Sequence, residues 1–168
     1  SDHFSDLQMI GDAAPVRTDR EIDVLTSHDL IDIIKDAGIV GLGGAAFPTH
    51  VKLTPPTGIS FDTLIINGAE CEPYLTCDDA IMRTQANDII DGVYYLMKAA
   101  GVSRAVIGIE NNKPEAIRAI SSASHRHDGI EVAVCRTNYP QGSEKQLIKA
   151  LTGKESPSGT IPSASGIV

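Results

Sequence analysis

The sequence predicts an α/β fold in which a parallel sheet carries helices on both of its faces. Three short apolar segments are typical of strands, at 63–66, 104–109 and 130–135. Segments with the apolar spacing of amphipathic helices lie between and after them. Strands that alternate with helices in this way indicate βαβ units, so we expect a Rossmann-like arrangement. The 168 residues are enough for one domain with a core of its own.

The N-terminal part of the chain divides into a tail and the first helix. Residues 1–25 show no clear period and mix Gly, Pro and charges, so we interpret them as a linker or as the tail of a preceding module. The α/β domain is expected to cover 26–168. Thr26 and Asp29 have the spacing of a capping box, and Gly38 is a natural end for the helix that they begin.

Two loops separate this helix from the first strand. The glycine loop, Gly-Leu-Gly-Gly-Ala-Ala-Phe-Pro-Thr, occupies 41–49, and a segment rich in Pro and Gly follows at 54–60. The first strand then ends at Asn67. Ligands of parallel α/β sheets sit at the carboxyl ends of strands, so the residues from Asn67 onward are candidates for a binding site.

A long helix is predicted between the first and second strands, over residues 78–100. Asp78 or Asp79 is expected to cap its start, and Gly101 to end it. Its expected buried stripe consists of Ile81, Ile89, Val93, Leu96 and Met97.

The second half of the chain repeats the alternation. Pro114 suits the first position of a helix that continues to about residue 122. After the third strand, a turn at 139–142 leads into a last helix at 143–151, which Gly153 closes. The tail from 155 to 168 is rich in Ser, Pro and Gly.

Composition argues against nucleic acid and against a membrane span. The net charge is −8 and only 4% of the residues are aromatic, whereas nucleic-acid binding needs a basic face or stacking rings. No run of about 18 apolar residues occurs. An acidic protein can still bind a nucleotide where backbone amides, helix ends and one or two cations provide the contacts.

The cysteines do not predict a metal centre. Cys71, Cys77 and Cys135 form no Cys-x-x-Cys pair, and an iron–sulfur cluster usually needs four thiolates at tight spacing. Three reduced cysteines are the simplest interpretation. The histidines have no ligand-like spacing, and no serine has the Gly-x-Ser-x-Gly setting of a hydrolase nucleophile.

The glycine loop is the first candidate for chemistry. Gly41, Gly43 and Gly44 allow backbone amides to converge on an anion, although a plain tight turn is the alternative. The spacing resembles a dinucleotide-binding fingerprint, but a helix precedes it where that fingerprint requires a strand. Lys52 supports phosphate binding, because a helix beginning near Pro48 would place this lysine one turn in.

Two further loops could complete a site. Asn67, Glu70 and Glu72 follow the first strand and could contact a planar heterocycle, ribose hydroxyls or an amide; a solvated acidic loop is the alternative. The turn from Tyr139 to Gly142 opens a helix, offers free amides and carries a ring that could stack on a ligand, although a packed tyrosine is also common.

Four ordered motifs together resemble a known family: GLGGAAFPTHVKL, INGAECEPYLTCDD, GIENNKPEAI and YPQGSEKQLIKALTGKE. They are similar to the C subunit of the Rnf complex, a membrane-bound assembly that exchanges electrons between ferredoxin and NAD and couples this to ion transport. The same core is similar to the flavin subunit of respiratory NADH dehydrogenase and to the cobalamin reductase of propanediol-degrading bacteria. The resemblance covers about residues 26–165.

The resemblance implies a set of contacts to FMN and NAD(H). They are Gly41, Gly43, Gly44, Phe47, Lys52, Asn67, Glu70, Glu72, Tyr139, Gly142 and Glu144. The glycine loop would wrap FMN, with Phe47 stacking toward the nicotinamide. The acidic pair would lie near flavin and NADH. Ala46, Ala69 and Ser143 depart from the family pattern, Ala46 by standing where a Gly is usual.

The leading hypothesis is hydride transfer between NADH and noncovalent FMN, followed by electron passage to iron–sulfur clusters. The resemblance implies that the [4Fe–4S] clusters belong to a region beyond Val168, that no residue here is a metal ligand, and that no side chain here must act as a proton donor. It also implies other Rnf subunits as partners and a peripheral place on the cytoplasmic side of the bacterial inner membrane. A cobalamin reductase with the same core and a non-redox nucleotide-binding or docking module are the alternatives.

Overall fold

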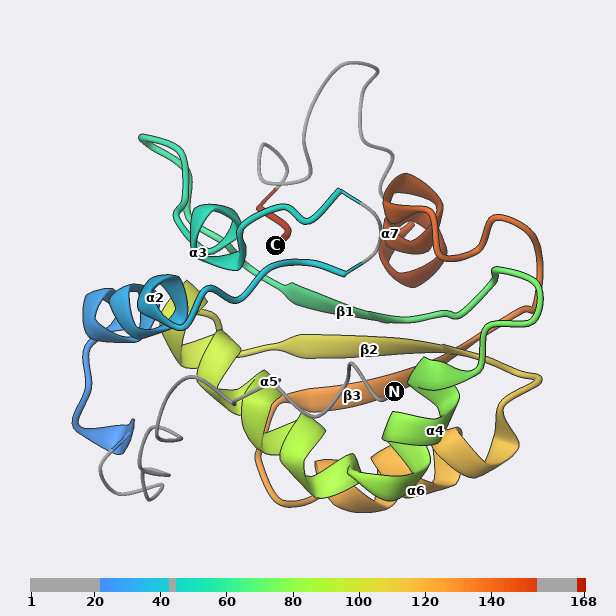
Figure 1. The fold of residues 1–168 in the computed structure, drawn as a ribbon. Helices are drawn as coiled ribbons and strands as arrows, with labels where there is room; N and C mark the ends of the chain where they lie inside the picture. Colours follow the sequence, from blue (N-terminus) through green and yellow to red (C-terminus); the bar gives the residue numbers. More distant parts are fainter. Residues whose placement is uncertain (1–21, 43–44, 154–165) are drawn as a thin grey trace, which may run out of the picture.

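A three-stranded parallel sheet forms the centre of the computed structural model (Figure 1), which describes residues 22–42, 45–153 and 166–168. Its strands are β1 (Leu64–Gly68), β2 (Ala105–Glu110) and β3 (Ile130–Cys135), in the order β1-β2-β3. The predicted fold class and all three strands are confirmed, with β1 extending to Gly68, just past the predicted end at Asn67. The helices are α2 (Ser27–Asp36), α3 (Thr49–Lys52), α4 (Cys77–Thr84), α5 (Ala86–Ala100), α6 (Pro114–Ser124) and α7 (Glu144–Thr152).

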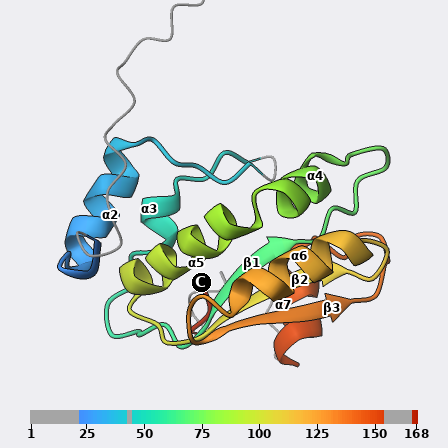
Figure 2. The same ribbon diagram turned by 90° about the horizontal axis from the view of Figure 1, so that it is seen from below.

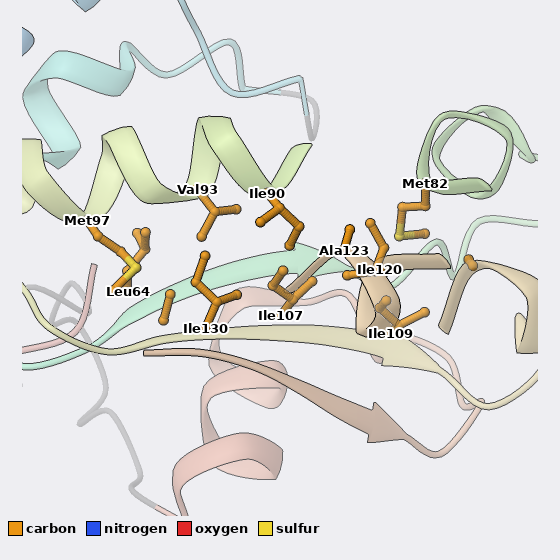
Figure 3. Close-up of a cluster of buried hydrophobic side chains, with 12 residues drawn as sticks. Leu64, Met82, Ile90, Val93, Met97, Ile107, Ile109, Ile120, Ala123 and Ile130 are labelled. Carbon is orange, nitrogen blue, oxygen red and sulfur yellow. The ribbon is translucent and has the colours of Figure 1, made fainter. Parts of the chain in front are cut away.

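Helices cover both faces of the sheet, as the sequence predicts. Figure 2 shows α5 and α6 on one face and α7 on the other. The main core lies between the sheet and α5 and α6, and Figure 3 shows that Ile90 of α5 points down toward Ile107 of β2 and Val93 toward Ile130 of β3. On the other face, α7 lies very close to β2, because a Cβ at Gly108 would lie 2.9 Å from the side chain of Leu147. Gly108 therefore lets α7 approach the central strand closely.

The first helix packs against the far end of α5. Thr26 and Asp29 form the predicted capping box, in which each side chain accepts a hydrogen bond from the other residue's backbone amide. Ile22 is buried with Leu30 in a second apolar cluster. Asp23 accepts a hydrogen bond from Lys98 at 2.9 Å. Residues 22–25, which the sequence assigns to a linker, therefore pack against the domain. Residues 1–21 lie outside the described residues.

The single helix predicted over 78–100 is wrong. Gln85 has φ −128° and ψ 34°, which breaks the segment into α4 and α5. The break allows Met82 of α4 and Ile90 of α5 both to face the core, although a straight helix would rotate them by roughly 80° relative to each other. Ile81, expected on the buried stripe, is exposed instead.

The predicted aspartate cap is also wrong. The residue at the cap position of α4 is Thr76, and its side chain makes no capping hydrogen bond. The backbone amides of Asp78 and Asp79 donate instead to the carboxylate of Glu70, which comes from the preceding loop. A cap from eight residues away leaves no local pattern in the sequence.

The sheet grows from β1 in two directions: β2 and β3 lie on one side of it, and the last described residues lie on the other. The Thr63–Ile167 pair is a parallel bridge, and the Ile65 amide donates to the Val168 carbonyl at 2.7 Å, so residues 166–168 lie on the edge of β1 opposite β2. The connections from β1 to β3 pass over one face, whereas α7 lies on the other (Figure 2). Ligands of open α/β sheets bind at such a reversal, outside the carboxyl ends of the strands. Within the described residues, no helix is long and apolar enough to cross a membrane.

Candidate functional site

The end of β1 and the turn before α7 meet at the reversal point. The side-chain amide of Asn67 donates from Nδ2 to the Gly142 carbonyl at 2.9 Å, and its Oδ1 accepts from the Ala69 amide at 3.1 Å. A Cβ at Gly142 would lie only 2.8 Å from the Ala69 carbonyl oxygen. Two predicted site residues that are 75 positions apart in sequence are thus in direct contact, and Gly142 is needed for that contact.

The glycine loop is closed at its neck by backbone pairing. The Gly41 amide donates to the Phe47 carbonyl at 2.9 Å, and Val40 forms an antiparallel bridge with Pro48. A Cβ at Gly41 would meet no atom closer than the Phe47 carbonyl, at 3.7 Å. The surrounding protein therefore does not itself require glycine at this position.

The tip of the glycine loop includes a strained residue. Ala46 has φ +48°, a left-handed conformation that costs a residue with a Cβ roughly 1–2 kcal/mol. In the family that this sequence resembles, this position is usually Gly. The predicted contacts at Gly43 and Gly44 lie outside the described residues.

Lys52 links the glycine loop to α7. Its Nζ lies 3.8 Å from Oε1 of Glu144 and 5.9 Å from the centroid of the Phe47 ring. The two charged side chains are 48% and 60% exposed, so the ion pair is weak and Lys52 remains accessible to an anion. The structure brings together these three predicted residues from two of the motifs.

Glu70 is buried and makes several hydrogen bonds. Its carboxylate accepts from the Asp78 amide at 2.9 Å, from the Asp79 amide at 3.4 Å and from Lys113 Nζ at 3.1 Å. Burial alone would raise the pKa of the Glu70 carboxyl, but these hydrogen bonds and one from Cys77 outweigh it, so the pKa is lowered. Glu70 therefore has a role within the protein, and its predicted contact with a ligand stays a prediction.

Glu70, Cys77 and Asp78 place three possible metal-ligand atoms within 4.8 Å of one another. The hydrogen bond to Glu70 raises the pKa of the Cys77 thiol, which disfavours the thiolate that a metal would need. Lys113 already places its ammonium group on Glu70. This arrangement favours a hydrogen-bonded carboxylate over a cation site.

A cleft of about 390 Å³ opens beside Glu70 at the carboxyl ends of the strands. Its lining includes Glu70, Cys71, Glu72, Pro73, Tyr74, Leu75, Thr76, Glu110, Asn112, Lys113, Thr137, Asn138 and Tyr139. Glu72 is exposed, and Tyr139 is 67% exposed. Tyr74 is fully exposed and has φ +68°. A strained, exposed aromatic residue beside a cleft is typical of a functional loop.

Glu110 and Lys113 line this cleft but were not among the predicted site residues. Glu110 is the last residue of the central strand and is 1% exposed, yet neither carboxylate oxygen has a hydrogen-bond partner among the described residues. Both residues belong to the GIENNKPEAI motif. The signal that could have found them is the strand-end rule, because they follow an apolar strand as Glu70 does.

The site has two chemically different ends. Around Lys52 and the glycine loop, an exposed cation suits an anionic group such as a phosphate. Around Glu72 and Tyr139, carboxylates and rings suit a neutral or cationic planar group with hydrogen-bond donors. A nucleotide has both kinds of group.

Comparison with known proteins supports this interpretation. A family model described as the Nuo51 FMN-binding domain matches residues 34–168. The match confirms the predicted similarity to the NADH dehydrogenase flavin subunit.

Two curated relatives have closely similar sequences. The C subunit of the Na⁺-translocating ferredoxin:NAD⁺ oxidoreductase complex of Acetobacterium woodii is 50% identical over 136 residues, which are 81% of this chain and 31% of that protein. The C subunit of the proton-translocating ferredoxin:NAD⁺ oxidoreductase complex of Clostridium ljungdahlii is 46% identical over 153 residues, which are 91% of this chain and 33% of that protein. The chain spans about a third of the length of these relatives, and their names confirm the predicted resemblance to the Rnf C subunit.

A solved structure has the same fold. The NAD⁺-reducing [NiFe]-hydrogenase in its air-oxidised state contains a chain that superimposes with a TM-score of 0.69 at 24% identity, covering 80% of this chain and 27% of that one. The likeness supports the α/β architecture derived from the strands and helices.

Proposed function

The chain belongs to the Nuo51 FMN-binding domain family, and on that basis we propose that it is the FMN- and NAD(H)-binding part of an Rnf-type C subunit. In this proposal, electrons pass between NAD(H) and iron–sulfur clusters carried outside these 168 residues, within a complex that couples ferredoxin and NAD to ion translocation. The names of the relatives support the assignment. The other subunits of the membrane complex would be its partners, with this part peripheral on the cytoplasmic side, where NADH is found.

One observation carries the proposal: three predicted motifs converge at the point where the winding of the sheet reverses. The contact between Asn67 and Gly142 joins the end of β1 to the start of α7, and the Lys52–Glu144 pair joins α7 to the glycine loop. Phosphate-bearing ligands favour such a position, because strand ends and a helix start offer backbone donors together.

The residues present fit a flavin nucleotide. The space beside the Cα of Gly41 would hold a Cβ without a clash, and Lys52 supplies an accessible cation for a phosphate. Tyr139 is largely exposed, and the Asn67 amide, beyond its contacts with Gly142 and Ala69, keeps a second N–H and a second lone pair for a planar heterocycle. In the proposed assignment, Lys52 and the glycine loop hold the phosphate end, and Asn67 lies near the ring.

The residues of the chain orient the reactants and provide the local charge. When bound, FMN supplies the chemistry that converts two-electron transfer into single-electron steps. Glu72 and Tyr139 would position the nicotinamide end of NADH in the cleft, where Glu72 can accept a hydrogen bond from an amide. No proton transfer by a side chain is required.

The test uses the full-length protein. We expect it to be yellow, to release FMN on denaturation and to be bleached by NADH. Lys52→Gln should raise the dissociation constant for FMN about tenfold, because a phosphate partner is lost. Lys35→Gln is the matched control, since Lys35 lies in the last turn of α2 and outside the site.

Three outcomes would contradict the proposal. Absence of flavin from the full-length protein would favour a non-redox docking module. Efficient reduction of a corrinoid, without electron transfer to iron–sulfur clusters, would favour a cobalamin reductase. Equal flavin retention in the Lys52 and Lys35 variants would remove Lys52 from the phosphate site.

A further inference from the structure

The loop between β1 and α4 is closed by one carboxylate. The side chain of Glu70, which begins the loop, accepts hydrogen bonds from the amides of Asp78 and Asp79 at its far end, at 2.9 and 3.4 Å. The Cys77 thiol lies 3.5 Å from the same carboxylate. These contacts hold the two ends of the loop together, independently of what lies at its tip.

Glu72 and Tyr74 lie at the tip of the closed loop. The Leu75 amide donates to the Glu72 carbonyl at 3.3 Å, which makes a turn, and Tyr74 in that turn has φ +68°. A left-handed tyrosine persists only where its surroundings fix the backbone. The closure by Glu70 constrains the backbone of the loop that carries both Glu72 and this tyrosine.

Lys113 ties this loop to the next strand end. Its Nζ lies 3.1 Å from Oε2 of Glu70, and the two side chains are only 12% and 2% exposed. Its backbone amide donates to the carbonyl of Glu110, the last residue of β2. The ion pair therefore fixes the position of the loop relative to the central strand, across the cleft that Glu72 lines.

A buried ion pair is a poor device for stability alone. Removing two charges from water costs about as much as their attraction returns, so apolar residues would often serve as well. What such a pair provides is a defined geometry, because a mispositioned loop would leave one buried charge without its partner.

We propose that Glu70 and Lys113 are positioning residues that set Glu72 for the nicotinamide end of NADH. The inference rests on the proposed function, because it takes Glu72 as an NADH contact. The two predicted acidic residues thereby have different roles: Glu70 holds the loop in place, and Glu72 contacts the ligand. Lys113 joins the site because its ion pair with Glu70, which we call the clamp, fixes the loop.

The test is a double-mutant cycle in the full-length protein. Lys113→Met should raise the dissociation constant and KM for NADH about tenfold, a larger change than in the flavin content or in the rate at saturating NADH. Lys113→Arg should restore NADH affinity, because it keeps the cation. Lys113→Met added to Glu72→Gln should cause no further loss, because the clamp acts through Glu72. Lys98→Met is the control: it removes the ion pair between Asp23 and Lys98, which lies in the last turn of α5.

The outcomes separate this inference from the proposed function. If NADH fails to reduce the wild-type flavin, the proposed function fails. If NADH reduces it but the Lys113 and Glu72 effects add, or Lys113→Met lowers NADH affinity no more than Lys98→Met does, the clamp is overturned. If Lys113→Met does not fold, Glu70→Gln in the same cycle gives the result, since Gln retains an acceptor for the Asp78 amide.

Discussion

Two buried glutamates at neighbouring strand ends have opposite surroundings. Glu70, just beyond β1, accepts hydrogen bonds from two backbone amides and the Lys113 ammonium. Glu110, the last residue of β2, has no hydrogen-bond partner for either carboxylate oxygen among the described residues. The difference shows that burial alone does not reveal the role of a carboxylate. Hydrogen bonds fix the loop after β1, whereas the end of β2 carries a buried carboxylate with no hydrogen-bond partner among the described residues.

Each carboxylate also helps to raise the pKa of a nearby cysteine thiol, one by a hydrogen bond and the other by its charge. The hydrogen bond to Glu70 raises the pKa of the exposed Cys77 thiol. At β3, burial raises the pKa of the Cys135 thiol, and the nearby Glu110 charge adds to that effect. Both thiols are thereby held in the protonated form, which makes neither a good nucleophile.

The largest expected effect is from Glu70→Met. The substitution leaves Lys113 buried without its counter-ion and removes the cap of α4, so the free energy of unfolding should fall by about 3–5 kcal/mol. Urea denaturation of the chain followed by circular dichroism measures it. Glu115→Met, which breaks an exposed pair with Arg83, is the control and should cost less than about 1 kcal/mol. Equal losses would erase the distinction between clamp and surface pair.

Acid should weaken the clamp in a defined direction. The pKa of Glu70 is lowered in the folded state, so its contribution to stability is complete above the unfolded value of about 4.3 and is lost as pH falls through the folded value. Lys113→Met removes one cause of the lowered pKa and should therefore make the loss of stability below about pH 4.3 less steep. Unfolding free energies at several pH values measure it. Parallel curves for the two proteins would show that Lys113 does not influence the Glu70 carboxyl.

Glu110→Met should act in the opposite direction. An apolar side chain of similar size removes a buried carboxylate without orphaning a partner, so stability should rise by about 1–2 kcal/mol. The same urea denaturation measures the gain. A loss of stability instead would show that Glu110 has a partner in solution and would make the two strand ends more alike.

The smallest expected effect concerns the strain at the loop tip. Tyr74→Gly should stabilise the chain by up to about 1 kcal/mol, because glycine adopts φ +68° freely and the exposed ring has little packing to lose. Thr76→Gly is the control in the same loop, where φ is −141° and no such gain is expected. Thermal unfolding of both variants provides the comparison. A loss at Tyr74 would mean that its ring packs on the domain in solution.

Local patterns made most of the fold predictable. The third strand, the start of α6 at Pro114 and the capping box at Thr26 agree with the sequence prediction, because each depends on residues within a few positions. The break at Gln85 and the cap by Glu70 depend on contacts between elements. Periodicity cannot report such contacts.

The candidate site was predicted in outline. The strand-end rule and the four motifs indicated that Asn67 and Gly142 belong to one site, and the structure brings them into contact. The rule was applied to the loops after β1 and β3 but not to the end of β2, so Glu110 and Lys113 were missed. Their burial could not be foreseen, because a charged pair after a strand is usually solvated.

The pairing of residues 166–168 with β1 has a consequence for how the chain folds during synthesis. The partners Thr63 and Ile167 are about 100 residues apart, so this side of β1 remains open until synthesis has passed residue 167. Contacts of such long range form late and slowly. An unpaired strand edge is also a template for aggregation. Among the described strands, this edge of β1 is therefore the last to be paired, and the nascent chain would be exposed to aggregation there until then.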